Sequence, residues 1–171
     1  MMRQPISDLQ LQPYGWIQSA NYIIAGVFII AFAAGLRKEL ASGFGAVMIP
    51  LFHVFTGVGV ILLGIFINGQ VQLYIGAFTF LSILSGFILL SRRFAGDPHW
   101  KGWGRATILT TLFMILLAGL FINGMIHHRP FAGILERLAV VTRLVWLFFF
   151  TAKLLGGRSL AEPVKGELEP A

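Results

Sequence analysis

The chain has 171 residues, of which 57% are hydrophobic and 12% charged, and its formal net charge is +6. Soluble domains carry about 25% charged residues and are about half apolar, so this composition indicates that lipid rather than water surrounds most of the protein. The basic residues are spread between apolar runs instead of forming one patch, which argues against nucleic acid as a partner and favours membrane lipids. The absence of cysteine excludes disulfides, thiolate catalysis and sulfur-ligated metals.

Four apolar runs are predicted to cross the membrane as helices. A hydrocarbon core of about 30 Å needs roughly 20 helical residues. Residues 1–16 are polar, and no cleavable signal peptide is expected because the apolar run that follows them is long enough to span. The four runs contain no charged side chain and cover residues 17–36, 44–67, 73–91 and 106–122.

The fifth apolar run, residues 134–155, is interrupted by Glu136, Arg137 and Arg143. A charge at mid-membrane costs about 2.5–3.5 kcal/mol on insertion scales. The strongly apolar residues 144–150 compensate for this cost. We therefore predict that this run spans the membrane instead of lying at its interface, and the fold class is an all-α polytopic bundle of five transmembrane helices.

Loop charges predict the orientation of this single transmembrane domain, residues 1–155. With the N-terminus outside, nine Lys and Arg residues fall in cytoplasmic segments and three in outer segments, as the positive-inside rule requires. The C-terminus then lies inside, and the polar residues 156–171 are predicted to be a disordered cytoplasmic tail. Aromatic belts are expected at both interfaces, with Trp100 and Trp103 inside and with Tyr14, Trp16 and Tyr74 outside.

An internal repeat has an offset of 55 residues. It places residues 64–69 (GIFING) on residues 119–124 (GLFING), and Arg37-Lys38 on Arg92-Arg93. The repeated unit is a hairpin of two helices with a basic loop between them and an Asn-Gly turn after them. Two copies in the same orientation make a parallel repeat, which is a plan also found in transporters. The alternative is that Asn-Gly recurs only because it suits tight turns.

Polar residues near the outer ends of the first and fifth helices form the candidate site. Glu136 and Arg143 are seven residues apart and share one helix face, and we expect them to pair with each other or with polar groups of another helix. Gln18 and Asn21 lie at a similar depth in the first helix. His53 is an ionisable group inside the second helix, for which a neutral histidine bonded to a neighbouring helix is the alternative. The candidate ligand-binding residues are Gln18, Asn21, His53, Glu136, Arg137 and Arg143, with a purely structural anchor as the equal alternative for the charged group.

No catalytic, metal or nucleotide motif stands out in the sequence. Gly57, Gly59 and Gly64 lack the preceding strand of a phosphate-binding loop, and we expect them to allow close helix packing instead. The adjacent His127 and His128 have no second pair of ligands that would complete a metal site. We therefore predict a non-enzymatic protein without metal or cofactor.

Several short segments resemble one known family. They are Ile6-Ser7-Asp8-Leu9, Pro13-Tyr14-Gly15-Trp16, Gly35-Leu36-Arg37, residues 59–66, the loop from Arg92-Arg93-Phe94 to Trp100-Lys101-Gly102, and residues 133–137 with Trp146. Together they resemble the uncharacterised prokaryotic multi-pass membrane proteins known as domain of unknown function 998, over the chain up to about residue 155. The resemblance implies a helical bundle in the cytoplasmic (inner) membrane of a prokaryote, and it implies no established activity.

Members of that family usually have six helices, with one before the segment that starts here at Ile6. We expect this chain to lack that helix, either as a truncated reading frame or as a real five-helix variant. Members also tend to carry Pro, Asp and then His where this chain has Ile67-Asn68-Gly69-Gln70, and often Gln-Arg where it has Glu136-Arg137. Family chemistry that relies on the missing Asp and His is therefore not expected here.

The sequence leaves three functions open. The leading one is a non-enzymatic membrane protein that binds a lipid or small apolar ligand between helices near the outer leaflet. A small transporter or transporter subunit is the first alternative, because of the parallel repeat. A membrane-embedded hydrolase that uses His53 or the outer histidines is the second. The sequence also leaves open a homodimer through glycine-lined helix faces.

Overall fold

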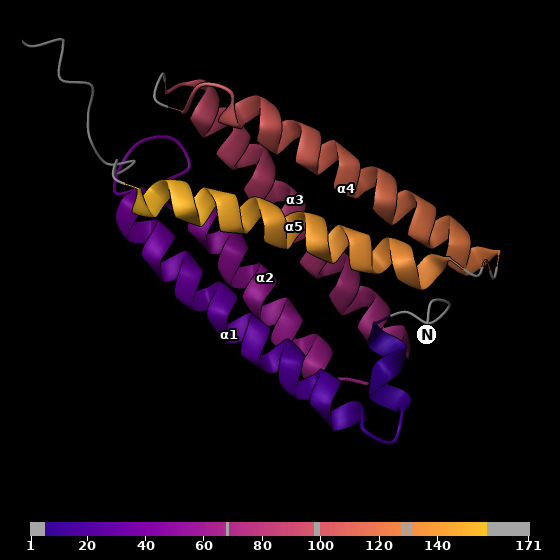
Figure 1. Ribbon diagram of the computed structural model, residues 1–171. Helices are drawn as coiled ribbons and strands as arrows, with labels where there is room; N and C mark the ends of the chain where they lie inside the picture. Colours follow the sequence, from indigo (N-terminus) through magenta and orange to yellow (C-terminus); the bar gives the residue numbers. More distant parts are fainter. Residues whose placement is uncertain (1–5, 68, 98–99, 128, 130, 157–171) are drawn as a thin grey trace, which may run out of the picture.

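The computed structural model describes residues 6–67, 69–97, 100–127, 129 and 131–156. In these residues a short 3-10 helix, η1 (Ser7–Leu11), precedes five α-helices, and no strand occurs (Figure 1). All five are long and apolar enough to cross a membrane, which confirms the predicted fold, including its charged fifth span. Apart from Gly156, the predicted tail lies outside the described residues. The helices are α1 (Gly15–Glu39), α2 (Met48–Ile65), α3 (Gly69–Ala95), α4 (Trp103–Ile126) and α5 (Ala132–Leu155).

The helix ends differ from the ends of the apolar runs for two physical reasons. Arg37 and Lys38 occupy the last turn of α1, because long basic side chains reach from a helix end towards the headgroups while the backbone stays helical. The second helix begins four residues later than predicted. Gly43 and Gly45 precede it with φ angles of +86° and +72°, a left-handed conformation that an α-helix excludes.

The predicted Asn-Gly turn after the fourth span is wrong. Asn123 and Gly124 lie inside α4, which continues to Ile126. Gly124 is buried, and a Cβ on it would lie 3.3 Å from the Cβ of Ala132 at the start of α5. The glycine thus allows α4 and α5 to approach each other, and it has no positive φ.

The 55-residue repeat is visible in where the helices begin. Met48 and Trp103, the first residues of α2 and α4, are 55 residues apart, and the starts of α1 and α3 are 54 apart. The packing is not repeated. α1 and α2 meet at the small residues Gly26 and Gly57, whereas the equivalent positions of α3 and α4 hold Leu81 and Leu112, which are 62% and 57% exposed.

Glycines also allow α2 to pack closely against its other neighbours. A Cβ on Gly59 would collide with the side chain of Thr79 on α3, and one on Gly64 would lie 2.8 Å from the carbonyl oxygen of Ser19 on α1. This confirms the predicted packing role of Gly57, Gly59 and Gly64. These glycines therefore serve contacts within one chain.

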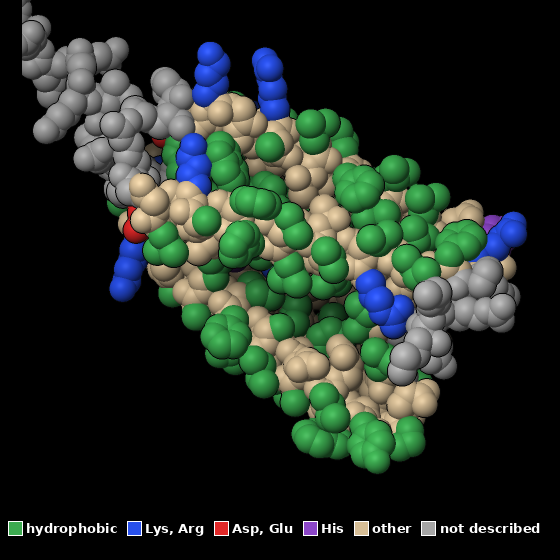
Figure 2. Space-filling view, in the orientation of Figure 1, with side chains coloured by type: hydrophobic (Ala, Val, Ile, Leu, Met, Phe, Trp, Pro, Cys, Tyr) green, Lys and Arg blue, Asp and Glu red, His purple; other side chains and the backbone are tan. Residues whose placement is uncertain are grey.

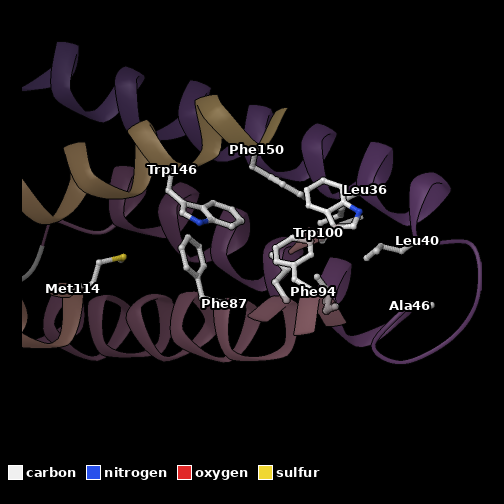
Figure 3. Close-up of a cluster of buried hydrophobic side chains, with 11 residues drawn as sticks. Leu36, Leu40, Ala46, Phe87, Phe94, Trp100, Met114, Trp146 and Phe150 are labelled. Carbon is white, nitrogen blue, oxygen red and sulfur yellow. The ribbon is translucent and has the colours of Figure 1, made fainter. Parts of the chain in front are cut away.

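The buried core gathers at the end of the bundle that carries Arg37, Lys38, Arg92, Arg93 and Lys153, here called the basic end. Its centre is a set of aromatic rings (Figure 3). Trp100 stacks on Phe94 with ring centroids 4.7 Å apart, and the Lys153 ammonium lies 4.7 Å from the centroid of Trp100. Trp100 is only 3% exposed, so it belongs to the core and not to the interfacial belt expected of it.

The opposite end, here called the η1 end, carries exposed aromatic rings. Tyr14, Trp16 and Tyr74 are 69–74% exposed, as expected for residues in an interfacial belt. Between the two ends, hydrophobic side chains cover much of the visible surface (Figure 2). Such a surface suits lipid contact, because lipid chains need no polar partner.

Candidate ligand-binding site

Gln10, a residue that the sequence did not single out, ties the η1 end together. Its side chain is 6% exposed. Its Nε2 donates to the Ser19 hydroxyl at 2.9 Å and to the Leu63 carbonyl at 3.0 Å, while Gln72 on α3 donates to its Oε1 at 2.5 Å. The Leu63 carbonyl is in the last turn of α2, where carbonyls lack helical partners. Gln10 thus links η1 with α1, α2 and α3.

The same end of the bundle holds Glu136. Its Oε2 accepts a hydrogen bond of 2.6 Å from the backbone N–H of Ile6. On α1, the Tyr22 hydroxyl lies within electrostatic reach of both Glu136 and Gln18. Glu136 and Gln18 thus share the half-buried Tyr22 as a common neighbour.

Two other candidates do not join this group. Asn21 is exposed on α1. The Arg137 guanidinium donates to the carbonyl of Gly133 in its own helix, at 3.0 Å. Neither arrangement directs a polar group into the bundle.

Arg143 lies deeper in the membrane than the sequence suggested. α5 begins at Ala132, so Arg143 is the twelfth of its 24 residues and lies about 17 Å from either end at 1.5 Å per residue. Trp146 and Phe150, on the same helix face, are 6% and 0% exposed, so this face turns into the bundle. No described residue hydrogen-bonds or ion-pairs with Arg143, and its Nε is buried without a partner. The expected pairing with Glu136 is not formed.

An unpaired guanidinium at this depth is energetically unfavourable. Insertion scales assign about 2.5–3.5 kcal/mol to an arginine at the centre of a transmembrane helix. The buried Nε cannot regain its hydration, and removing a partner from a buried charge is among the costlier defects in proteins. Arg143 therefore destabilises the ligand-free bundle unless an anion compensates its charge.

His53 faces the same interior. Its ring is 4% exposed, and it lies 5.5 Å from the ring of Phe32 on α1, centroid to centroid. Its Nδ1 is 2.9 Å from the carbonyl oxygen of Ile49. The histidine is thus bonded to its own helix and not, as expected, to a neighbour. The charge of Arg143 acts on this ring, so α2 and α5 direct polar groups towards the same space.

The His53 ring gives no support for hydrolysis. Among the described residues, Ile49 is its only hydrogen-bond partner. A hydrolytic site needs a nucleophile or water-activating group within hydrogen-bond reach of the base. The described residues around His53 therefore offer a polar ring edge without a catalytic pair.

A cavity of about 620 Å³ lies between α4 and α5, towards the basic end. Ala106 on α4 and Val145 and Phe149 on α5 form apolar walls, while Lys101 and Thr142 supply polar groups. Trp146 lines this cavity and also lies 4.4 Å from the ring of Phe87 on α3, centroid to centroid. The sequence could not reveal this cavity, since most of the residues that line it belong to the fourth and fifth apolar runs.

Comparison with known proteins identifies the family. The chain matches the family of proteins of unknown function DUF998 over residues 1–153, so it belongs to this family, as the short sequence segments suggested. No curated protein and no solved structure matches the chain. Because the function of this family is unknown, the activity has to be argued from the site.

Proposed function

We propose that this member of the DUF998 family is a non-enzymatic membrane protein that binds a lipid or small apolar molecule between its helices. The observation that carries the proposal is the cavity between α4 and α5. Its volume of about 620 Å³ falls within the range of roughly 300–1,000 Å³ that is typical of ligand pockets. Its place between two membrane-spanning helices gives a membrane-dissolved ligand direct access.

The lining favours an amphiphile over a water-soluble metabolite. Val141, Val145 and Phe149 line one side of the cavity on α5, where an acyl chain or ring gains the contacts that close packing provides. Lys101 is exposed at the basic end of the cavity. A lysine at that height suits a polar or anionic headgroup, because its ammonium remains near the interface.

The test is to fill the cavity and measure bound lipid. Ala106→Phe and Val145→Phe each add a ring to the cavity wall, and the double variant should lower the amount of co-purifying lipid at least about fivefold, equivalent to roughly 1 kcal/mol. The measurement is mass spectrometry of lipids extracted from the purified full-length protein. Leu109→Phe is the matched control, because Leu109 is on α4, is 66% exposed and does not line the cavity. Equal lipid content in all variants would refute the proposal.

A small transporter is the second candidate, favoured by the helices that begin at 55-residue intervals. Parallel repeats are one of the plans on which transporters are built. The unequal packing of the two hairpins speaks for a binding role instead, because the Gly26–Gly57 contact has no counterpart in the second hairpin. Uptake of a ligand into vesicles that contain the protein, above that of empty vesicles, would decide for transport.

A further inference from the structure

The space between α5 and the hairpin of α1 and α2 combines an unpaired positive charge with a polar ring. α5 makes its close helix contact with α4, and it crosses in front of α2 and α3 (Figure 1). In the space-filling view the face between α5 and this hairpin is hollowed and surrounded by hydrophobic side chains (Figure 2). Phe32 on α1 and Phe150 on α5 lie 6.2 Å apart between ring centroids, so the two helices contact each other at these rings.

The Arg143 guanidinium has no means of neutralisation among the described residues. Its Nε is buried and unpartnered, and its position halfway along α5 puts the headgroups beyond the reach of its side chain. His53, on which its charge acts, cannot compensate it, because an imidazole is either neutral or positive.

The state of His53 follows from its hydrogen bond. The Ile49 carbonyl can only accept, so Nδ1 carries the proton. Burial among apolar side chains disfavours a charged imidazole, so the ring is neutral and its Nε2 is an acceptor. The space therefore contains one net positive charge.

We propose that this space binds the carboxylate of an amphiphilic or small organic acid, with Arg143 as its counter-ion. One positive charge matches a monoanion. A planar guanidinium donates two parallel hydrogen bonds to a carboxylate. The depth of the site disfavours a phospholipid, whose headgroup stays at the interface. Phe32, next to His53, and Phe150, which lies 6.2 Å from Phe32 between ring centroids, provide apolar surface for the body of the acid. This site is separate from the cavity between α4 and α5 and does not depend on it.

The experiment measures binding of defined acids to purified full-length protein by native mass spectrometry. The probes are oleate, octanoate and oleyl alcohol, which has the chain of oleate without its charge. We expect oleate or octanoate to bind and oleyl alcohol to bind at least about tenfold more weakly. Binding of oleate alone assigns the site to a fatty acid, whereas equal binding of octanoate assigns it to a small carboxylate. Equal binding of oleate and oleyl alcohol would overturn the proposal.

Variants of two arginines in the same helix locate the site. Arg143→Gln should weaken carboxylate binding at least about tenfold, and Arg143→Lys should weaken it less, because the charge remains while the paired geometry is lost. Arg137→Gln is the control and should stay within about twofold, since Arg137 bonds to its own helix. Unchanged carboxylate binding in Arg143→Gln contradicts the proposal. A dimer in which a second copy covers Arg143 and no probe binds also contradicts it. If Arg143→Gln does not fold, Arg143→Lys alone decides.

The two proposals can fail independently. The Ala106→Phe and Val145→Phe variants fill the cavity between α4 and α5 and should leave carboxylate binding at Arg143 unchanged. Loss of carboxylate binding in these variants, with normal binding in Arg143→Gln, would place the acid in the cavity and overturn the Arg143 site. If these variants lose co-purifying lipid but still bind the carboxylate, the cavity binds lipid and the Arg143 site binds the acid independently of it.

Discussion

A Cβ placed on Gly26 of α1 would lie 2.6 Å from the carbonyl oxygen of Gly57 on α2, and one placed on Gly57 would lie 2.8 Å from the carbonyl oxygen of Gly26. The two backbones touch here because neither residue carries a side chain. Packing of this kind replaces the hydrophobic effect inside a membrane, since lipid chains are as apolar as the helix surfaces. The contact fixes the first hairpin, against which the rest of the bundle is built.

Gly57→Ala should therefore destabilise the protein. The added methyl group meets backbone that cannot move without separating α1 from α2, and overpacking of this kind costs about 1–3 kcal/mol. Thermal unfolding of the purified protein in detergent measures the change. Gly76→Ala is the matched control, because no atom lies within 4 Å of a Cβ there and alanine favours a helix over glycine by about 1 kcal/mol. If both variants unfold at the same temperature, the close contact is not important for stability.

Gln10→Ala should loosen the η1 end. The substitution leaves the Leu63 carbonyl without the bond from Gln10 Nε2 and removes the acceptor of Gln72, and an unsatisfied buried group costs about 1–3 kcal/mol. We expect faster amide hydrogen exchange at the ends of α1 and α2 that lie near η1. Gln12→Ala, at an exposed position just after η1, should show no such change. Faster exchange in both variants would mean that Gln10 is not the specific link.

Arg143→Leu should stabilise the ligand-free protein. The variant replaces a charge halfway along α5, whose Nε is buried without a partner, by an apolar side chain. A charge at this depth costs about 2.5–3.5 kcal/mol on insertion scales, so its removal should raise the free energy of unfolding. Unfolding experiments on lipid-depleted protein test this, with Arg137→Leu as the comparison on the same helix. A structural anchor predicts the opposite sign, so clear destabilisation by Arg143→Leu would assign Arg143 to the architecture and remove the basis of the carboxylate site.

The orientation of the bundle is open to a direct test. The loop charges predict that a reporter fused at Gly69 lies outside and that reporters at Gly96 and at the C-terminus lie inside. Paired reporters that are active only in the periplasm or only in the cytoplasm measure this. A cytoplasmic Gly69 or an external C-terminus would reverse the orientation, and the cavity near Lys101 would then open to the outer leaflet.

The candidate site was partly predictable from the sequence. The spacing of Glu136 and Arg143 predicted their shared face, since helical periodicity is a local property. The sequence did not reveal that Glu136 would bond to the backbone of Ile6, 130 residues away. Gln10 has no sequence signal beyond its place next to the segment Ile6-Ser7-Asp8-Leu9, because its importance depends on where α2 ends.

The sequence by itself determined the five apolar spans, their basic loops and the family, because transfer into lipid depends on composition over about 20 residues and needs no knowledge of neighbours. Only the tertiary structure decided which helices touch. The 55-residue repeat suggested two equivalent hairpins, but Gly26 and Gly57 allow contact where Leu81 and Leu112 do not. The tertiary structure also decided that Arg143 lies within electrostatic reach of His53 on another helix. Partners in space depend on how whole helices cross, and that crossing is fixed by packing between distant segments.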